Sequence, residues 1–137
     1  MRGFRVWSDY WKKYATEAEL YMDGSVDAIF EDADGVPHHE NTDLVVEFGT
    51  GLKDKNGKEI YEGDILEQFV CGVKMFKGKP CGRRTIWQVR WNDNECCFEL
   101  HYLRGSIFGD SLMSCDDEYE VIGNIHENKE LCGEEKE

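Results

Sequence analysis

The chain has 137 residues, of which 29 are acidic and 16 are basic, so its formal charge at pH 7 is −13. This length fits one domain or two small subdomains that share a core, and a 12% aromatic content with four tryptophans argues against disorder. No run approaches the roughly 20 apolar residues of a membrane span, and the start of the chain has no apolar signal region, so we expect a cytoplasmic protein.

Residues 1–49 are predicted to form short strands separated by turns. Alternating apolar and polar residues predict strands at 4–7 and 44–48. The apolar spacing between 11 and 20 also fits an amphipathic helix, so helix and strand are both open there. Asp23-Gly24 is typical of a hairpin turn, and residues 31–41 are predicted to be an exposed loop.

A glycine-rich turn segment follows. Gly51 and Gly63 flank it, and Asn56-Gly57 predicts the positive backbone dihedrals of a type I′ turn. Gly63 allows a bend before Asp64 enters the next strand. Asp64 with Glu62 could form a general acid/base pair, but an aspartate beside a glycine turn more often accepts hydrogen bonds from backbone amides.

The second half of the chain is predicted to be all β. Residues 85–91 have the clearest two-residue period, and 96–102 alternate in the same way around the polar residues 92–95, which predicts a hairpin. A last strand is expected at 120–125, with a bulge at Gly123.

Four segments resemble the YopX family, small proteins encoded by bacteriophages and prophages: residues 4–7, 50–64, 89–91 and 120–128. The family brings no established biochemical activity. The resemblance favours a hairpin over a helix between 11 and 20. With the strand pattern, it predicts a mostly β fold in which a hairpin-rich segment, 1–49, packs on a small SH3-like β-barrel, 50–128. Residues 129–137 are predicted to be a frayed acidic tail.

Charge is unevenly distributed. Residues 1–50 carry 4 basic and 11 acidic side chains, and residues 111–137 carry 2 and 9. Between residues 74 and 90 there are six basic residues and no acid: Lys74, Lys77, Lys79, Arg83, Arg84 and Arg90. With Phe76 and Trp87 these could contact nucleic acid, but a solvated loop that offsets the acidic ends is the plainer interpretation.

The sequence predicts no metal site and no cofactor. Its six cysteines are scattered, at positions 71, 81, 96, 97, 115 and 132, and no histidine has zinc-ligand spacing to any of them. We therefore expect reduced thiols, with a Cys/His zinc site as the sharper alternative. Phosphate-loop, nucleophile-elbow and zinc-protease motifs are absent from the sequence.

Together these patterns predict a non-enzymatic accessory protein of a phage or prophage, acting in the bacterial cytoplasm by binding a protein partner. Self-association and imitation of nucleic acid by the acidic surface are further options. The main alternative is a small nucleic-acid-binding module that uses the stretch from Lys74 to Arg90. An enzyme with a site hidden from sequence is a third hypothesis.

Overall fold

The computed structural model describes residues 3–76, 79–105, 111–113 and 118–132. The chain divides into two compact units, residues 1–49 and 50–137, and each has its own hydrophobic cluster. The strand pairs with a described register are all antiparallel, and the sheets are curled. The prediction of a mostly β fold is therefore confirmed, while the SH3-like barrel stays a prediction.

The first sheet of the N-terminal unit is built around β1 (Phe4–Ser8). This strand pairs on one side with β2 (Lys13–Tyr14) and on the other with the beginning of β6 (Leu44–Lys53). The register places Val6 opposite Val46, and Val6 is buried in the core. The strand predicted at 44–48 is confirmed and continues to Lys53.

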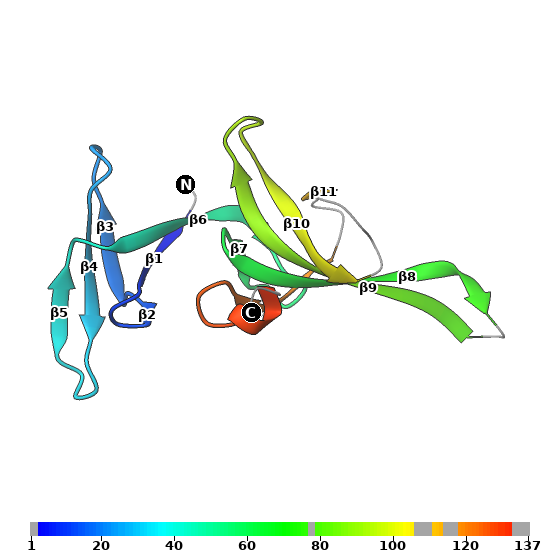
Figure 1. Cartoon of the computed structure of the whole chain (residues 1–137), viewed down its shortest axis with the longest axis horizontal. Coiled ribbons are helices and arrows are strands. Elements are labelled where there is room, and N and C mark those ends of the chain that lie inside the picture. The colour runs from blue at the N-terminus through cyan, green and yellow to red at the C-terminus, as the bar shows by residue number, and fades with distance from the viewer. Residues whose placement is uncertain (1–2, 77–78, 106–110, 114–117, 133–137) are drawn as a thin grey trace. The chain divides into compact units, whose positions relative to one another are not determined.

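The second sheet of this unit has the order β3-β4-β5, with strands Glu17–Leu20, Val26–Glu31 and Pro37–Glu40 (Figure 1). Side chains of β4 alternate strictly between buried and less buried positions, because successive residues of a strand point to opposite faces. The inward side chains join Val6 in the core of the unit, which consists of Val6, Val26, Ala28 and Phe30.

The observed positions of β2, β3 and β5 test two of the predictions for this unit. Because β2 and β3 both lie between residues 11 and 20, the strand alternative is confirmed there and the helix is wrong. The exposed loop predicted at 31–41 is confined to the turn at residues 32–36, and it is wrong for residues 37–40, because β5 pairs with β4 from Glu31 opposite Pro37 to Ala28 opposite Glu40. A proline is tolerated as the first residue of a strand, where its missing N–H leaves no ladder bond unmade.

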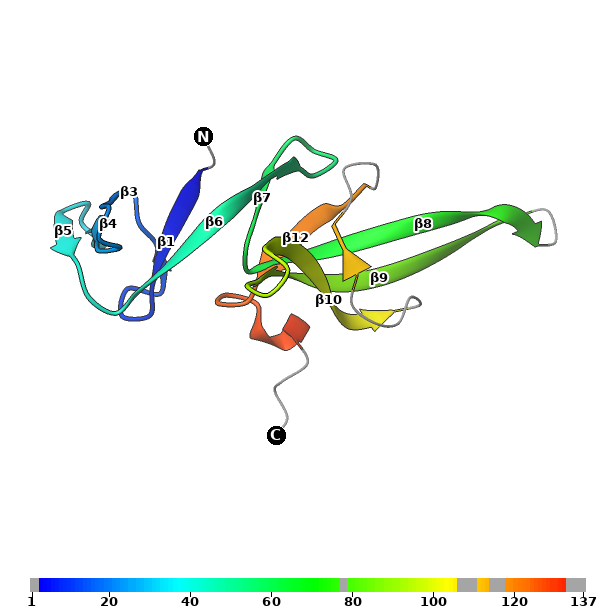
Figure 2. The ribbon, with the colours of Figure 1, turned by 90° about the horizontal axis from the view of Figure 1, so that it is seen from above.

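The C-terminal unit contains a sheet with the order β11-β10-β9-β8-β12. In chain order its strands are Asp64–Phe76 (β8), Lys79–Asn92 (β9), Cys97–Gly105 (β10), Ser111–Leu112 (β11) and Glu120–Asn124 (β12). β8 and β9 continue side by side beyond their neighbours and form a two-stranded arm (Figures 1 and 2). The hairpin predicted around 92–95 is confirmed by the pairing of Asn92 with Cys97.

The core of this unit includes Trp87 and Val89 of β9, which are two positions apart and point to the same face. It consists of Ile60, Leu66, Trp87, Val89, Leu100 and Tyr119. Trp87 is buried without an unsatisfied polar atom, because its indole N–H donates to the side-chain oxygen of Gln68 at 2.9 Å. This agrees with the rule that buried polar groups are hydrogen-bonded.

The turn between β6 and β7 (Glu59–Tyr61) differs from the predicted type. Among its central residues only Gly57 has a positive φ, +87°, whereas a type I′ turn needs one at Asn56 as well. The Gly57 amide donates to the carbonyl of Asp54, and the Asp54 amide donates to the carbonyl of Lys58. This pattern is a type I turn followed by a glycine bulge, so the type I′ prediction is wrong.

After β12 the chain turns back, so that the side chain of Asn128 contacts the end of β12. The predicted bulge at Gly123 is confirmed by a register shift between Val121 and Gly123. A Cβ added to Gly123 would lie 2.5 Å from the side-chain oxygen of Asn128, which accepts a hydrogen bond from the Asn124 amide at 3.1 Å. The short helix η1 (Lys129–Cys132) then forms, so the prediction of a frayed tail is wrong for these four residues, and 133–137 lie outside the described residues.

Candidate functional site

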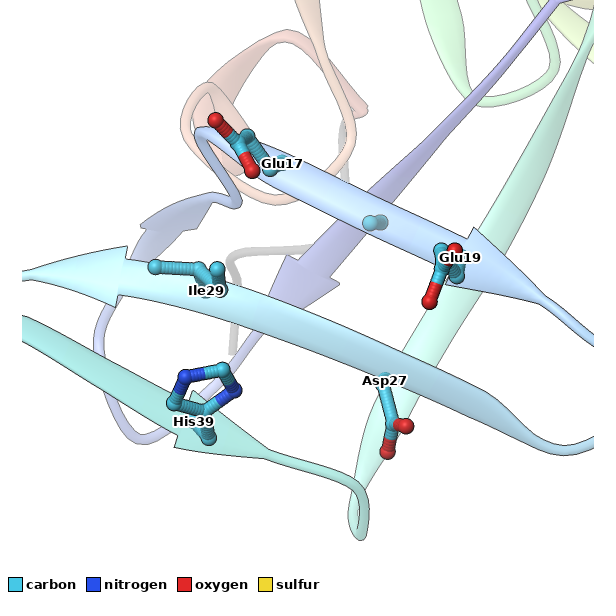
Figure 3. Close-up of a pocket in the computed structure, with 6 residues that line it drawn as sticks. Glu17, Glu19, Asp27, Ile29 and His39 are labelled. Atoms are coloured by element: carbon cyan, nitrogen blue, oxygen red, sulfur yellow. The ribbon is translucent and has the colours of Figure 1, made fainter.

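The outward face of the sheet β3-β4-β5 carries a shallow hollow of about 220 Å³ (Figure 3). Its outward residues come from all three strands: Glu17 and Glu19 from β3, Asp27 and Ile29 from β4, and His39 from β5. Ile29 is half-buried while the three carboxylates are exposed. The hollow therefore has an apolar centre with an acidic border.

Strand register explains why these side chains gather. Glu19 lies opposite Asp27, Glu17 lies opposite Ile29, and Ile29 lies opposite His39. Because paired residues on neighbouring strands project from the same face, one alternating pattern in each strand gives a common outward surface.

The hydroxyl of Tyr21 lies 3.0 Å from a carboxylate oxygen of Glu19 and 2.9 Å from one of Asp27. A phenol has one proton, so it donates to one of the two carboxylates at a time. Hydrogen bonding to Asp27, and next to Glu19, raises the pKa of Tyr21 to about 12. A tyrosine is neutral at physiological pH even at its ordinary pKa, so Tyr21 adds no negative charge, and its hydroxyl links the two carboxylates through hydrogen bonding.

Buried carboxylates in both units stabilise the fold by accepting hydrogen bonds. Glu47, 2% exposed, accepts hydrogen bonds from the Arg5 guanidinium at 2.8 Å and from the Tyr14 hydroxyl at 2.9 Å. Asp64, 1% exposed, accepts from the amide of Tyr61 at 2.8 Å. The interpretation of Asp64 as a backbone cap is thus supported by a direct contact.

Asp54 is a further buried carboxylate, which sequence reasoning did not single out. It accepts hydrogen bonds from the amides of Asn56 and Lys58, both at 2.9 Å, and from Val121 at 3.1 Å. Burial works against ionisation, but the hydrogen bonds from Val121, Lys58 and Asn56 together lower the pKa of Asp54. The signal in sequence was the pattern Asp-x-Asn-Gly, whose aspartate is suited to accept from amides two and four residues further on.

The residues of the predicted glycine-rich turn segment lie at different positions in the structure. Asn56 and Gly57 lie in the β6–β7 turn, and Gly51 lies within β6 with a φ of +87°. Gly63 has a φ of +91°, donates its amide to the carbonyl of Val89 and accepts from the amide of Ile125 through its own carbonyl. Gly63 therefore links the start of β8 to two other segments of the chain.

The described residues of the predicted basic stretch lie in strands, Lys74 in β8 and the others in β9, with Arg90 opposite Glu99 of β10, so the interpretation of the stretch as a solvated loop is wrong for them. The described guanidinium groups are paired: Arg84 with Glu67 on the neighbouring strand, and Arg90 with Glu99 at 3.5 Å. The structure describes only the backbone of Lys74, Lys79 and Arg83, and Lys77 lies outside the described residues. Two cations of this stretch are thus partly neutralised by glutamates of adjacent strands.

Cys96, Cys97 and Cys132 are free thiols, and the described residues hold no group of three or more metal-ligating side chains. Cys96 lies in the β9–β10 turn with a φ of +54°, so the prediction that it shares a strand with Cys97 is wrong. Cys115 falls outside the described residues, as do the side chains of Cys71 and Cys81. In the described parts of the chain, no helix has the length and apolar character needed to span a bilayer.

The two-unit, mostly β architecture and the turn segment before β8 together define a fold class with known members. The family described as YopX protein matches residues 3–132, so this chain belongs to the YopX family. The family membership predicted from the four sequence segments is therefore confirmed, and it establishes no biochemical activity.

Two solved structures are similar to the chain. Protein EF1440 from Enterococcus faecalis is 31% identical, and the match covers 96% of this chain and 98% of that chain with a TM-score of 0.56. Protein yopX from Bacillus subtilis is 18% identical, with coverage of 93% and 95% and a TM-score of 0.55, and it shows the fold alone. No curated protein matches the chain.

The outward face of β3-β4-β5 is the part of the candidate site that sequence reasoning missed. Its signal was present in the alternation of residues 26–31 and in the acidic residues two apart at Glu17 and Glu19. The competing helical pattern between 11 and 20 hid it, because a helix would have placed Glu17 and Glu19 about 200° apart.

Proposed function

We propose that this protein is a non-enzymatic binding protein, an accessory protein of a phage or prophage that acts in the bacterial cytoplasm. Its partner is a protein that presents basic residues around an apolar contact. The binding surface is the outward face of β3-β4-β5, and its acidic border is complementary to such a partner.

The observation that carries this proposal is the arrangement around Ile29. A half-buried apolar side chain lies at the centre, and Glu17, Glu19 and Asp27 lie around it. Protein interfaces have this anatomy, with an apolar centre and a polar rim. Acidic rims attract basic partners and increase the rate of association.

The roles of the buried carboxylates support binding rather than catalysis. Glu47, Asp54 and Asp64 each accept hydrogen bonds from groups that hold strands or turns in place. A general base must instead have its carboxylate within reach of a substrate proton. These three carboxylates are engaged by the protein itself.

Affinity capture from a bacterial lysate, followed by identification and titration of the captured protein, tests the proposal. The variant Glu17→Lys with Glu19→Lys reverses the charge on one side of the hollow, and we expect it to lose the partner. The variant Asp93→Lys with Glu95→Lys makes the same charge change in the exposed β9–β10 turn and should retain it. A partner bound equally by both variants would contradict the proposal.

The second candidate is a small nucleic-acid-binding module. It is favoured by the β8–β9 register, which places Arg83 opposite Val70 and Lys79 opposite Phe76, so that cations collect on one arm. Oligonucleotide titrations at several salt concentrations test it, with an expected slope of roughly 0.7–0.9 per phosphate contact. Binding at 0.1 M salt that is lost in Arg83→Ala with Arg84→Ala would place this function first.

A further inference from the structure

A second hollow, of about 350 Å³, lies in the C-terminal unit. It is lined by basic side chains, whereas the hollow on the outward face of β3-β4-β5 is bordered by acidic ones. Side chains from four elements line it: Arg84 and Ile86 of β9, Arg104 and Gly105 of β10, Ile122 of β12, and Leu131 of η1. Two guanidinium groups thus border a floor of three aliphatic side chains. Its volume falls within the range of about 300–1,000 Å³ that is usual for small-molecule sites.

The local backbone brings these groups together. A register shift between Tyr102 and Arg104 interrupts the pairing of β10 with β9, and bulges of this kind redirect a side chain. Gly105 follows with a φ of +120°, and a Cβ there would lie 2.3 Å from the carbonyl oxygen of Arg84. The absence of a side chain at Gly105 therefore lets the end of β10 approach β9 closely.

The hydrogen bonds of Arg104 leave part of its guanidinium available. One terminal nitrogen donates to the carbonyls of Glu130 at 3.3 Å and Leu131 at 3.2 Å. No carboxylate of the described residues pairs with Arg104. Arg84 donates through its Nε to Glu67, and its side chain is 69% exposed.

We propose that this hollow binds a carboxylate joined to an apolar chain. Arginine presents its donors as a planar fork that matches a carboxylate, and Arg104 is held in place by the two carbonyls of η1. The aliphatic floor formed by Ile86, Ile122 and Leu131 receives the apolar chain. The site lies in the other unit from the proposed protein-binding face and has the opposite charge, so it goes beyond the proposed function.

Titration of the full chain with octanoate, followed by amide NMR, tests the ligand class. We expect saturable, sub-millimolar binding with shifts at the amides of Gly105 and Leu131. Octanol lacks the charge and acetate lacks the chain, so both should bind at least roughly tenfold more weakly. Equal binding of octanol, acetate or inorganic phosphate would overturn the proposal.

A second probe distinguishes the two sources of such a carboxylate. N-acetyl-glycyl-leucine imitates the C-terminus of a protein, whereas octanoate imitates a free alkyl acid. Tighter binding of the dipeptide assigns the site to a protein C-terminus, and tighter binding of octanoate assigns it to an alkyl acid. Both results support the proposed chemistry, and failure of both probes to bind overturns it.

Matched variants locate the binding in this hollow. Arg104→Gln should lower the affinity for octanoate at least roughly tenfold, and Arg104→Lys, which keeps the charge without the fork, should lower it less. Leu131→Ser, on a short helix outside the sheet, should lower it by a factor of roughly ten. Lys53→Gln removes a positive charge from β6 and should change nothing.

Circular dichroism melts identify any variant that does not fold, and Leu131→Ser keeps the test independent of Arg104. Unchanged affinity in both Arg104→Gln and Leu131→Ser would overturn the proposal.

Discussion

Two turns of the molecule have the same local design in different surroundings. The β4–β5 turn of the N-terminal unit begins at Asp32, and the β6–β7 turn of the C-terminal unit begins at Asp54. In each, a glycine of positive φ, Gly35 or Gly57, donates its amide to the aspartate carbonyl. Each aspartate side chain also accepts hydrogen bonds from two amides further along its turn.

The second carboxylate oxygen distinguishes the two turns. In Asp32, about a third exposed, it contacts His38 of the adjacent strand at 2.9 Å. In Asp54, 7% exposed, it accepts from the amide of Val121, 67 positions away. The same short pattern thus makes a local turn in one unit and joins distant segments in the other. Local sequence specifies the turn, and the surrounding fold decides how much stability depends on it.

The largest expected effect follows from that difference. Asp54→Ala leaves three partly buried amide hydrogen bonds without their acceptor, so we expect a loss of about 3 kcal/mol in the free energy of unfolding. Asp32→Ala exposes its amides to water and should cost about 1 kcal/mol. Urea unfolding of both variants measures the difference, and equal losses would show that the contact with Val121 contributes nothing.

The two glycines should respond alike, because the conformational cost is local. A Cβ on Gly57 or Gly35 meets no atom within 4 Å, so valine is disfavoured by the positive φ alone. We expect each Gly→Val change to cost about 1–3 kcal/mol. Asn56→Ala, at a neighbouring residue without positive φ, should cost less than about 0.5 kcal/mol. Thermal melts that show no loss for Gly57→Val would contradict the turn geometry.

A smaller effect is expected in acid. The hydrogen bond from His38 and then that from Val36 lower the pKa of Asp32, and backbone amides lower that of Asp54 against the effect of burial. A carboxyl whose pKa is lower in the folded state stabilises the protein above its unfolded pKa of about 3.9, and this stabilisation is lost as the pH falls through the folded pKa.

Unfolding free energies measured between about pH 5 and pH 2 test this directly. The wild-type protein should lose stability across this range. Asp32→Asn and Asp54→Asn should each lose less, because asparagine does not titrate. A slope unchanged in both variants would contradict the assignment of the acid sensitivity to these turns.

The smallest effect concerns the contact between His38 and Asp32. Both side chains are partly exposed, at 42% and 32%. Exposed ion pairs contribute about 0.2–1 kcal/mol, so His38→Gln should lower the unfolding free energy by less than about 1 kcal/mol. His39→Gln, at the next residue on the opposite face, is the matched control. A loss near that of Asp54→Ala would show that the N-terminal turn also depends on tertiary contacts.

Local sequence patterns predicted much of the fold. The alternation at 85–91 gave a buried strand, and Asp23-Gly24 and residues 92–95 gave the hairpins that the structure contains. Asn56-Gly57 correctly placed a turn but not its type, which follows from the backbone dihedrals. The hydrogen bond from Val121 to Asp54 needs the tertiary structure. The strand Pro37–Glu40 was missed because a proline and two histidines read as a loop, and its pairing with β4 outweighs that weak preference.

The candidate sites were less predictable from the sequence, because they too depend on contacts between segments that are distant in the chain. The hollow around Ile29 needs the register of three strands, and the one around Arg104 needs a bulge and a helix that begins 25 residues later. Arg84 was singled out in the sequence for its neighbours in the chain, whereas in space its neighbours are Arg104 and Leu131. The sequence therefore showed that Arg84 belongs to a basic stretch, whereas the strand pairing determines which side chains surround it.

The contact between Gly123 and Asn128 has an evolutionary consequence. The side chain of Asn128 occupies the space that a Cβ of Gly123 would fill, and it also accepts a hydrogen bond from the Asn124 amide. Gly123→Ala alone should therefore be selected against, while Gly123→Ala together with Asn128→Gly relieves the clash. Related sequences are expected to change these two positions as a pair and to keep the number of residues between them fixed.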